Sequence, residues 1–348
     1  MIRFGPAGIP LSCKGRTLRD GIEDVHNLGL TAMEGQLVRV SAQERAAEPE
    51  EIGNTPRSIT GDMIIEIVRK KGTKDVTISN PDETIREGDT LAVLSCGLAR
   101  NYEELTGLRI MAEDLDVQMS IHTPYYMDII SDGELYFKSM DSIRWAGIIA
   151  HELGAGTVVT HVGLYGDSSP KTALKKTKER LTELTTWYKK HGIRVTLGLE
   201  LSGRQEVFGS LSEISKLCRD IEGIVPAVNF AHYHSREGGI LREPKDFDKV
   251  LDSIEELTRG EFYTHFSGVE HEEGNEKRFT SIKKGDLRFE PLAEAIVDRN
   301  QPITVISSSP LLEHDAMYMK VILERVLAKK VTKEIKNGAP KKERAGSR

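Results

Sequence analysis

Short apolar runs rich in β-branched residues alternate with amphipathic segments along most of this chain. In the amphipathic segments the apolar positions return every three or four residues, as in GSLSEISKLCRDIEG at 209–223, where Ser210 or Ser212 is placed to cap a helix. Eight runs have the length and composition of strands, and these are 2–5, 32–40, 117–122, 157–163, 194–200, 224–232, 261–268 and 302–307. Eight strand–helix units predict an α/β fold of the closed (β/α)8 TIM-barrel type. A doubly wound open sheet is the alternative, but FGPAGIP lacks the G-x-G-x-x-G loop that usually follows its first strand.

One segment, residues 49–97, interrupts this alternation between the second strand and a helix expected to begin near Leu98. Its β-rich runs are divided by Gly, Asn-Pro and Glu-Gly-Asp, which is typical of a small sheet with tight turns. We therefore predict a barrel formed by 1–48 and 98–328, with a small β-rich insertion at 49–97. The ending IREGDTLAVLS faintly resembles the small ligand-sensing domains attached to potassium-transport regulators.

The last twenty residues, 329–348, are rich in lysine and contain Gly, Pro and Ser without apolar periodicity. We expect a disordered basic tail there. Such a tail adds nonspecific affinity for nucleic acid in some proteins, but a solvated terminus is the commoner explanation.

The overall composition is that of a globular protein, with 348 residues, 38% hydrophobic and 29% charged. A net charge of -6 provides no general basic field for nucleic acid, so a phosphate-binding surface would have to be a local patch. Three cysteines far apart indicate neither a disulfide framework nor a thiolate zinc site. The chain lacks a signal-like start and an apolar run of about 20 residues, so we expect a cytoplasmic protein without a membrane partner.

Polar residues fall at the ends of consecutive predicted strands. His122 ends the third strand, His161 lies near the end of the fourth, and Glu200 ends the fifth. Side chains at the carboxyl ends of barrel strands converge on one face, so these three residues should be neighbours. Two imidazoles and a carboxylate form a zinc-type ligand set.

The next two strands continue the series, with Asn229, His232 and His234 in VNFAHYH and His265 in YTHFSG. A single histidine at a strand end is more often a hydrogen-bonded structural residue than a ligand. Polar residues at five successive strand ends reverse that expectation and indicate a metal-binding pocket.

The remaining candidates have simpler explanations. We interpret His26, His151 and His191, on helices or helix ends, as structural. His271, in the predicted loop GVEHEEGNE, either folds back over the pocket with a neighbouring glutamate (Glu270, Glu272 or Glu273) or belongs to a solvated acidic loop. A serine triad is disfavoured because the G-x-S-x-G elbow is absent, and the serines at 307–309 suit a loop, a helix cap or a phosphate contact.

Several motifs together resemble the endonuclease IV family of apurinic/apyrimidinic endonucleases, particularly its archaeal branch. They occur in the order SIHTPYYMDI, VVTHVGLYG, GLELSG, FGSLSEI, VNFAHYHSREGG and YTHFSG. The resemblance covers roughly residues 1–48 and 98–328. It implies a barrel of the superfamily that also contains xylose-isomerase-like isomerases and epimerases. It also implies a trinuclear zinc site that cleaves DNA 5′ of an abasic deoxyribose.

By this resemblance, the first metal would be held by His122, His161 and Glu200, with Glu200 also bridging to the second metal. His265 would bind the second metal and His232 the third.

Three positions depart from the family pattern. Asn229 replaces an aspartate, Ser307 replaces the glutamate of the last strand, and Lys277-Arg278-Phe279 replaces an Asp-x-His pair. The first metal thus keeps its protein ligands, whereas the second and third lose theirs in part. One divalent ion, zinc or manganese, with an open water position is the expected occupancy. The additional ligands for further ions would be Asn229, His234, His271 or Glu276.

Three hypotheses about function remain open. The first is a metal-dependent phosphodiesterase acting on abasic double-stranded DNA, with Glu200 catalytic and Lys14, Arg16 and Arg236 holding phosphates. The second is a sugar or sugar-phosphate isomerase or epimerase in which Glu34 or Glu200 is the base. The third is a barrel that has lost catalysis and binds a ligand or partner. The sequence indicates no oligomeric state.

Overall fold

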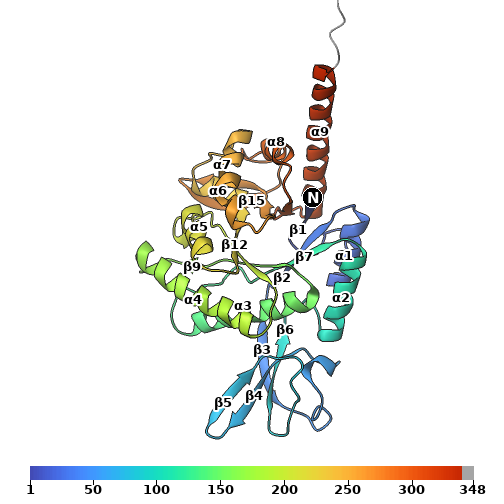
Figure 1. Ribbon diagram of the computed structural model, residues 1–348, viewed down its shortest axis with the longest axis vertical. Coiled ribbons are helices and arrows are strands. Elements are labelled where there is room, and N and C mark those ends of the chain that lie inside the picture. Colours follow the sequence, from blue (N-terminus) through green and yellow to red (C-terminus); the bar gives the residue numbers. More distant parts are fainter. Residues whose placement is uncertain (339–348) are drawn as a thin grey trace, which may run out of the picture.

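Eight parallel strands form the central sheet, and the two strands at its ends meet to close a barrel (Figure 1). The structure, a computed structural model, describes residues 1–338. The strand order is β1-β16-β13-β12-β10-β8-β7-β2, and a bridge between Ala7 and Glu34 joins the first and last of these. The strands are β1 (Ile2–Pro6), β2 (Ala32–Gln36), β7 (Gln118–His122), β8 (Thr157–Thr160), β10 (Thr196–Glu200), β12 (Ile224–Asn229), β13 (Phe262–Phe266) and β16 (Ile303–Ser307). The predicted (β/α)8 barrel is confirmed.

Helices surround the barrel and bury their apolar faces against it, because the apolar positions of each helix lie on one side. They are α1 (Leu18–Asn27), α2 (Tyr102–Asp114), α3 (Glu134–Leu153), α4 (Pro170–Lys190), α5 (Leu211–Asp220), α6 (Phe230–Arg236), α7 (Pro244–Ile254), α8 (Phe289–Arg299) and α9 (Glu313–Gly338), with 3-10 turns at Pro56–Ser58 and Glu255–Leu257. Ser210 caps α5, since its side chain accepts a hydrogen bond from the backbone N–H of Glu213.

Two short antiparallel pairs lie beyond the carboxyl ends of the barrel strands. One joins β9 (Gly163–Leu164) to β11 (Val207–Phe208), and the other joins β14 (Gly268–Glu272) to β15 (Asn275–Thr280). His271 therefore lies on a strand of the β14–β15 hairpin rather than in the predicted loop. Both pairs border the face of the barrel on which this fold places its ligands.

The insertion forms an antiparallel sheet of its own, in the order β3-β6-β4-β5 (Figure 1). Its strands are β3 (Ser41–Ala46), β4 (Ile64–Lys71), β5 (Lys74–Ile78) and β6 (Thr90–Ser95). The sheet thus begins before the predicted boundary at 49, and the run 32–40 is a barrel strand only as far as Gln36. The difference arises because SAQERA joins the sheet through backbone pairing with β6 while its side chains are largely exposed.

Helix α9 extends into the segment predicted as a disordered tail, since residues 329–338 are helical and project away from the barrel (Figure 1). Lysine, which makes up four of these ten residues, is a good helix former. Residues 339–348 of the predicted tail lie outside the described residues. Within residues 1–338, every helix is too short or too polar to cross a membrane.

Candidate metal centre

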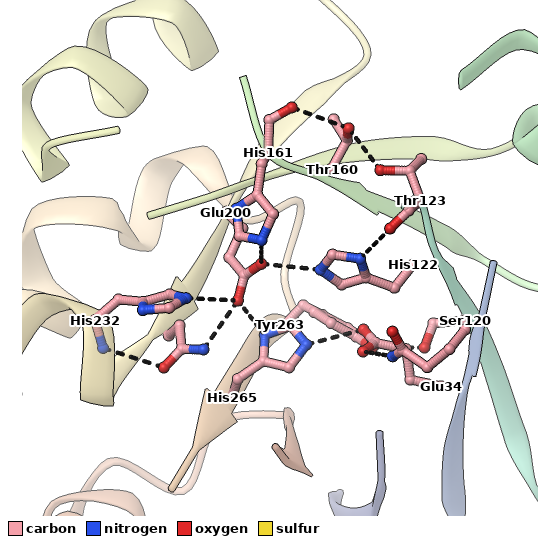
Figure 2. A network of polar contacts seen from close by, with 12 residues as sticks. Glu34, Ser120, His122, Thr123, Thr160, His161, Glu200, His232, Tyr263 and His265 are labelled. Atoms are coloured by element: carbon pink, nitrogen blue, oxygen red, sulfur yellow. Dashed lines mark hydrogen bonds and ion pairs between the residues drawn. The ribbon is translucent and has the colours of Figure 1, made fainter. Parts of the chain in front are cut away.

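A buried cluster of imidazoles surrounds one carboxylate at the carboxyl end of the barrel (Figure 2). Strand β7 ends at His122, β10 ends at Glu200, and His265 lies in β13. His161 follows β8 directly, and His232 lies in the first turn of α6. The structure therefore brings together the five residues that the sequence singled out from successive strand ends.

Glu200 is the centre of this cluster. Its Oε2 lies 2.9 Å from Nε2 of His122 and 3.0 Å from Nε2 of His161. Its Oε1 accepts a hydrogen bond of 2.9 Å from the side-chain amide of Asn229. Nε2 of His232 and Nδ1 of His265 are farther from Oε1, at 3.6 and 3.7 Å. Oε2 of Glu200 thus contacts His122 and His161, whereas Oε1 lies on the side of Asn229, His232 and His265.

Burial and charge set the protonation of these groups. Burial would raise the pKa of Glu200, but the neighbouring histidines, His161 first among them, hold it well below the usual value. Burial would lower the pKa of His122, but the hydrogen bond to Glu200 and the charges of Glu34 and Glu200 raise it to about 9. Burial lowers the pKa of His161 to about 4. In the metal-free protein, an ionised Glu200 thus contacts a protonated His122 and a neutral His161.

His122, His161 and Glu200 fit a divalent ion. Each offers a ligand atom, and these atoms all lie within 4.8 Å of one another. Two ligands in a tetrahedral zinc site are about 3.3 Å apart, given bonds of about 2.0–2.1 Å, so the observed separations need widen only slightly. Nδ1 of His122 donates to the carbonyl of Thr123 at 2.6 Å, which leaves Nε2 to face Glu200. The chemistry of the donor set suits zinc or another ion that binds imidazole.

Asn229 does not act as a cation ligand in this geometry. Its Oδ1 accepts hydrogen bonds from the backbone N–H groups of Ala231 and His232 and thereby caps α6. Since backbone N–H groups only donate, the atom facing them must be the oxygen, and the amide NH₂ must face Glu200. The asparagine therefore donates a hydrogen bond where the family pattern has an aspartate ligand. The predicted extra ligand is corrected to a cap and donor.

A histidine–carboxylate pair lies where the resemblance to endonuclease IV implies a third metal. Nδ1 of His232 lies 2.5 Å from Oε2 of Glu276, which β15 carries. The ring of Phe279 lies 5.2 Å from that of His232, centroid to centroid. A Cβ at Gly203 would lie 2.6 Å from Oε2 of Glu276, so only glycine lets the hairpin approach this closely. Burial would lower the pKa of His232, but Glu276 raises it.

Glu34 on β2 also belongs to the site. From the sequence it was expected only as an alternative base for a sugar isomerase or epimerase. It is fully buried, and its Oε2 accepts hydrogen bonds from Tyr263 at 2.8 Å and from Nε2 of His265 at 2.9 Å. Its Oε1 accepts one from Gln36 at 2.8 Å. Burial would raise the pKa of Glu34, but the charge of His265 lowers it, so the carboxylate is ionised and accepts three hydrogen bonds. The sequence signal was a glutamate inside the apolar run AMEGQ.

His234 and His271 form a separate cluster with Asp286, whose Oδ1 lies 3.2 and 3.4 Å from their Nε2 atoms. The backbone N–H of Leu241 donates to Nδ1 of His234 at 3.1 Å. Nε2 of a neutral His234 must then carry the proton and cannot bind a metal without losing this bond. We interpret the cluster as a contact between α6 and the β14–β15 hairpin, which corrects the prediction that these histidines rescue ions in the main pocket.

The predicted phosphate ligands lie elsewhere or are already engaged. The guanidinium of Arg236 donates to the carbonyls of Ser202, Arg204 and Val207 and so holds the chain before and at β11. Arg16 donates to the carbonyl of Pro10 at 3.0 Å and is exposed, as is Lys14. None of the three lines the pocket that contains Glu200.

That pocket has a volume of about 710 Å³. The charged residues that line it, apart from the histidines, are Glu34, Asp128, Glu200, Arg204 and Glu276. Nδ1 of His265 and Oγ of Ser308, on two residues that line the pocket, are buried and lack a hydrogen-bond partner. Unpaired polar atoms of this kind indicate a place for a polar ligand. Apart from its four histidines, the pocket thus carries more carboxylates than permanent cations, and three residues that could hold a metal ion lie on its floor.

Residues 97–310 match the xylose isomerase-like TIM barrel family. The chain belongs to this family. Within it, the chain is 27% identical over 268 residues to an uncharacterized protein of Methanocaldococcus jannaschii, covering 73% of this chain and 96% of that protein.

Two solved structures in this fold are similar. Endonuclease IV from Thermus thermophilus has a TM-score of 0.59 at 18% identity, covering 93% of this chain and 99% of its own. L-ribulose 3-epimerase has the same TM-score of 0.59 at 12% identity, covering 98% of this chain and 100% of its own. At these identities the likeness shows the fold alone, and the site must be interpreted from its own residues.

Proposed function

We propose that this member of the family is a metal-dependent hydrolase with a single ion held by His122, His161 and Glu200. The observation that carries the proposal is the convergence of these three ligand atoms on the floor of the pocket. A zinc ion with three protein ligands would activate water by lowering its pKa towards about 7 and would polarise the bond under attack.

The protein's own groups complete the chemistry. His232 lines the same pocket with Nε2 turned toward Glu200, and Glu276 holds its Nδ1. A histidine oriented by a carboxylate is suited to take a proton from water and return it to a leaving group. Gln36, Tyr263 and His265 donate hydrogen bonds to Glu34, and we assign this carboxylate the role of positioning His265.

The charge of the pocket bears on the substrate. Abasic DNA is the substrate that the resemblance to endonuclease IV implies, and that enzyme shares the fold. However, apart from its four histidines, this pocket is lined among the described residues by four carboxylates and a single guanidinium, that of Arg204. Because so few permanent cations are available to bind a phosphodiester strand, we propose small-molecule hydrolysis first and abasic-site incision as the substrate to be compared with it.

A second candidate, a sugar isomerase or epimerase, is favoured by one observation. Glu34 and Glu200 lie on the pocket floor together, and an epimerase shares the fold. In that case Glu34, whose Oε1 accepts a hydrogen bond from Gln36, would be the base. We place the hydrolase first because His122, His161 and Glu200 offer a set of ligand atoms for one ion.

The test combines metal analysis with activity. The purified protein should hold about one ion per chain, and chelator-sensitive hydrolysis should appear on a panel of uncharged ester, amide and glycoside substrates but not on an abasic-site duplex. Glu200→Gln should lose both ion and hydrolysis, whereas Glu23→Gln on the exposed face of α1 should retain both.

Three results would overturn parts of this proposal. A protein that takes up no zinc or manganese lacks the proposed site. Incision of the abasic duplex would assign DNA as the substrate. Interconversion of free sugars without hydrolysis would favour the second candidate.

A further inference from the structure

One wall of the pocket consists of apolar and aromatic side chains that are largely exposed to solvent. Tyr125 and Tyr126 on the segment after β7 are 76% and 45% exposed, Leu135 at the start of α3 is 42% exposed, and Leu164 on β9 is 50% exposed. All four line the pocket that contains Glu200. Single exposed apolar side chains are ordinary, but several around one opening mark a binding surface.

The wall and the floor differ in chemistry. The floor carries the metal ligands, Glu34 and His232, whereas Leu135, Leu164, Val207 and the two tyrosines make the wall. The rings of Tyr125 and Tyr126 meet edge to face with centroids 5.8 Å apart, which fixes their relative orientation. A molecule that fills the pocket must therefore be polar at one end and apolar at the other.

Charge and size restrict the occupant further. In the part of the chain that the structure describes, the lining holds four histidines and one permanent cation, Arg204, against four carboxylates, those of Glu34, Asp128, Glu200 and Glu276. A volume of about 710 Å³ lies in the range typical of small-molecule sites, about 300–1,000 Å³. The exposed wall belongs to the same concavity as the metal floor, so one ligand can cover both.

We infer that the substrate is a small uncharged or cationic molecule with a polar reactive group and an aryl or bulky alkyl body. The reactive group reaches His122, His161 and Glu200, and the body packs against Tyr126, Leu135 and Leu164. This inference rests on the proposed function, because it takes the metal floor as the place of reaction.

Two hydroxamic acids test whether the pocket selects an apolar substituent. Both bind a metal through the hydroxamate group, and they differ only in the phenyl or methyl group attached to it. Calorimetric titration of the zinc-loaded protein should show benzohydroxamic acid binding about tenfold tighter than acetohydroxamic acid, the ratio expected from burying an aryl group. Leu164→Ser and Tyr126→Ser should bring this ratio close to one and leave the affinity for acetohydroxamic acid unchanged. Val331→Ser, at an equally exposed apolar residue on the projecting end of α9, should leave the ratio as it was.

Phenylphosphonate tests whether the pocket disfavours anionic ligands, because it combines the phenyl ring of benzohydroxamic acid with a dianionic group. It should bind at least about tenfold more weakly than benzohydroxamic acid. Equal affinity for the two hydroxamic acids, with the ion retained, overturns the inference and leaves the proposed metal site standing. Tighter binding of the phosphonate overturns the charge requirement. A protein that retains no ion and binds neither hydroxamic acid overturns the proposed function itself.

Discussion

At the scale of single residues, the proton on His122 and a metal ion compete for one position. Nδ1 of His122 is held by the carbonyl of Thr123, so the second proton of the imidazolium lies on Nε2 between His122 and Glu200. A pKa of about 9 keeps this proton in place at neutral pH. A ligand nitrogen must lose its proton before it binds a cation.

The pH dependence of metal binding follows from this competition. Below pH about 9, each ion should expel about one proton, and the apparent affinity should fall about tenfold for each unit of decrease in pH. Calorimetry in buffers of different ionisation enthalpy measures the released protons directly. Binding at pH 7 without proton release would show that His122 is not a ligand.

A change at Asn229 should alter the number of ions. Asn229→Asp removes the donor that faces Glu200 and places a second carboxylate beside that of Glu200. Without metal, the unpaired like charges should lower the free energy of unfolding by about 1–3 kcal/mol. With excess zinc, the ion content should rise from one per chain toward two. Elemental analysis and thermal unfolding check both effects.

The matched control is Asn80→Asp, at an exposed asparagine whose Oδ1 accepts from the backbone N–H of Asp82, a role that a carboxylate can also fill. The Asn80→Asp variant should change neither the ion content nor the free energy of unfolding. An Asn229→Asp variant that stays mononuclear would mean that the bridge to a second ion needs more than the missing aspartate.

At the scale of elements, the barrel was predictable because parallel strands carry their polar residues to a common edge. His122 and Glu200 could be placed together from their strands alone. Strand β3 was not predictable, since Ser41–Ala46 carries two alanines, no β-branched residue and no buried face. The run 224–232 hid a change from β12 to α6, and with it the role of Asn229 as a helix cap. The pairing of His232 with Glu276 depends on how the hairpin folds back, which no local pattern shows.

We predict that His271 stabilises the β14–β15 hairpin and does not bind a metal ion. His271→Ala removes the contact through Asp286 to His234 on α6. Asp286 is half exposed, so the loss of global stability should be below about 1 kcal/mol. Amide exchange within the hairpin should nevertheless become faster, while the ion content stays the same. Glu270→Ala breaks the exposed pair with Arg278 in the same hairpin and should leave the exchange unchanged. Loss of an ion with His271 would contradict this interpretation.

At the scale of the whole molecule, the inserted sheet has two apolar faces. Ile64, Ile67, Ile85 and Leu91 form a small core within the insertion. Residues on the other face, including Met63, Ile65 and Leu94, belong to the main core together with Tyr102 of α2. Arg57 adds a two-pronged ion pair with Glu152 of α3. The insertion therefore packs against helices α2 and α3 on the outside of the barrel and is not held by its linking segments alone.

Deletion of residues 41–96 tests how far the barrel depends on this packing. Ser41 and Ser95 are paired in the sheet, and paired antiparallel residues lie only about 5 Å apart, so a short Gly-Ser linker can replace the segment without strain. The deletion should still lower the melting temperature by more than about 5 °C, because Leu98 and Tyr102 lose their apolar cover. Arg57→Ala, which removes partly exposed ion pairs with Asp82 and Glu152 and the cation–π contact with Tyr102, should cost only about 1–2 kcal/mol. A deletion variant that melts like the full chain would make the insertion an independent module, and its evolution could then be separated from that of the metal site.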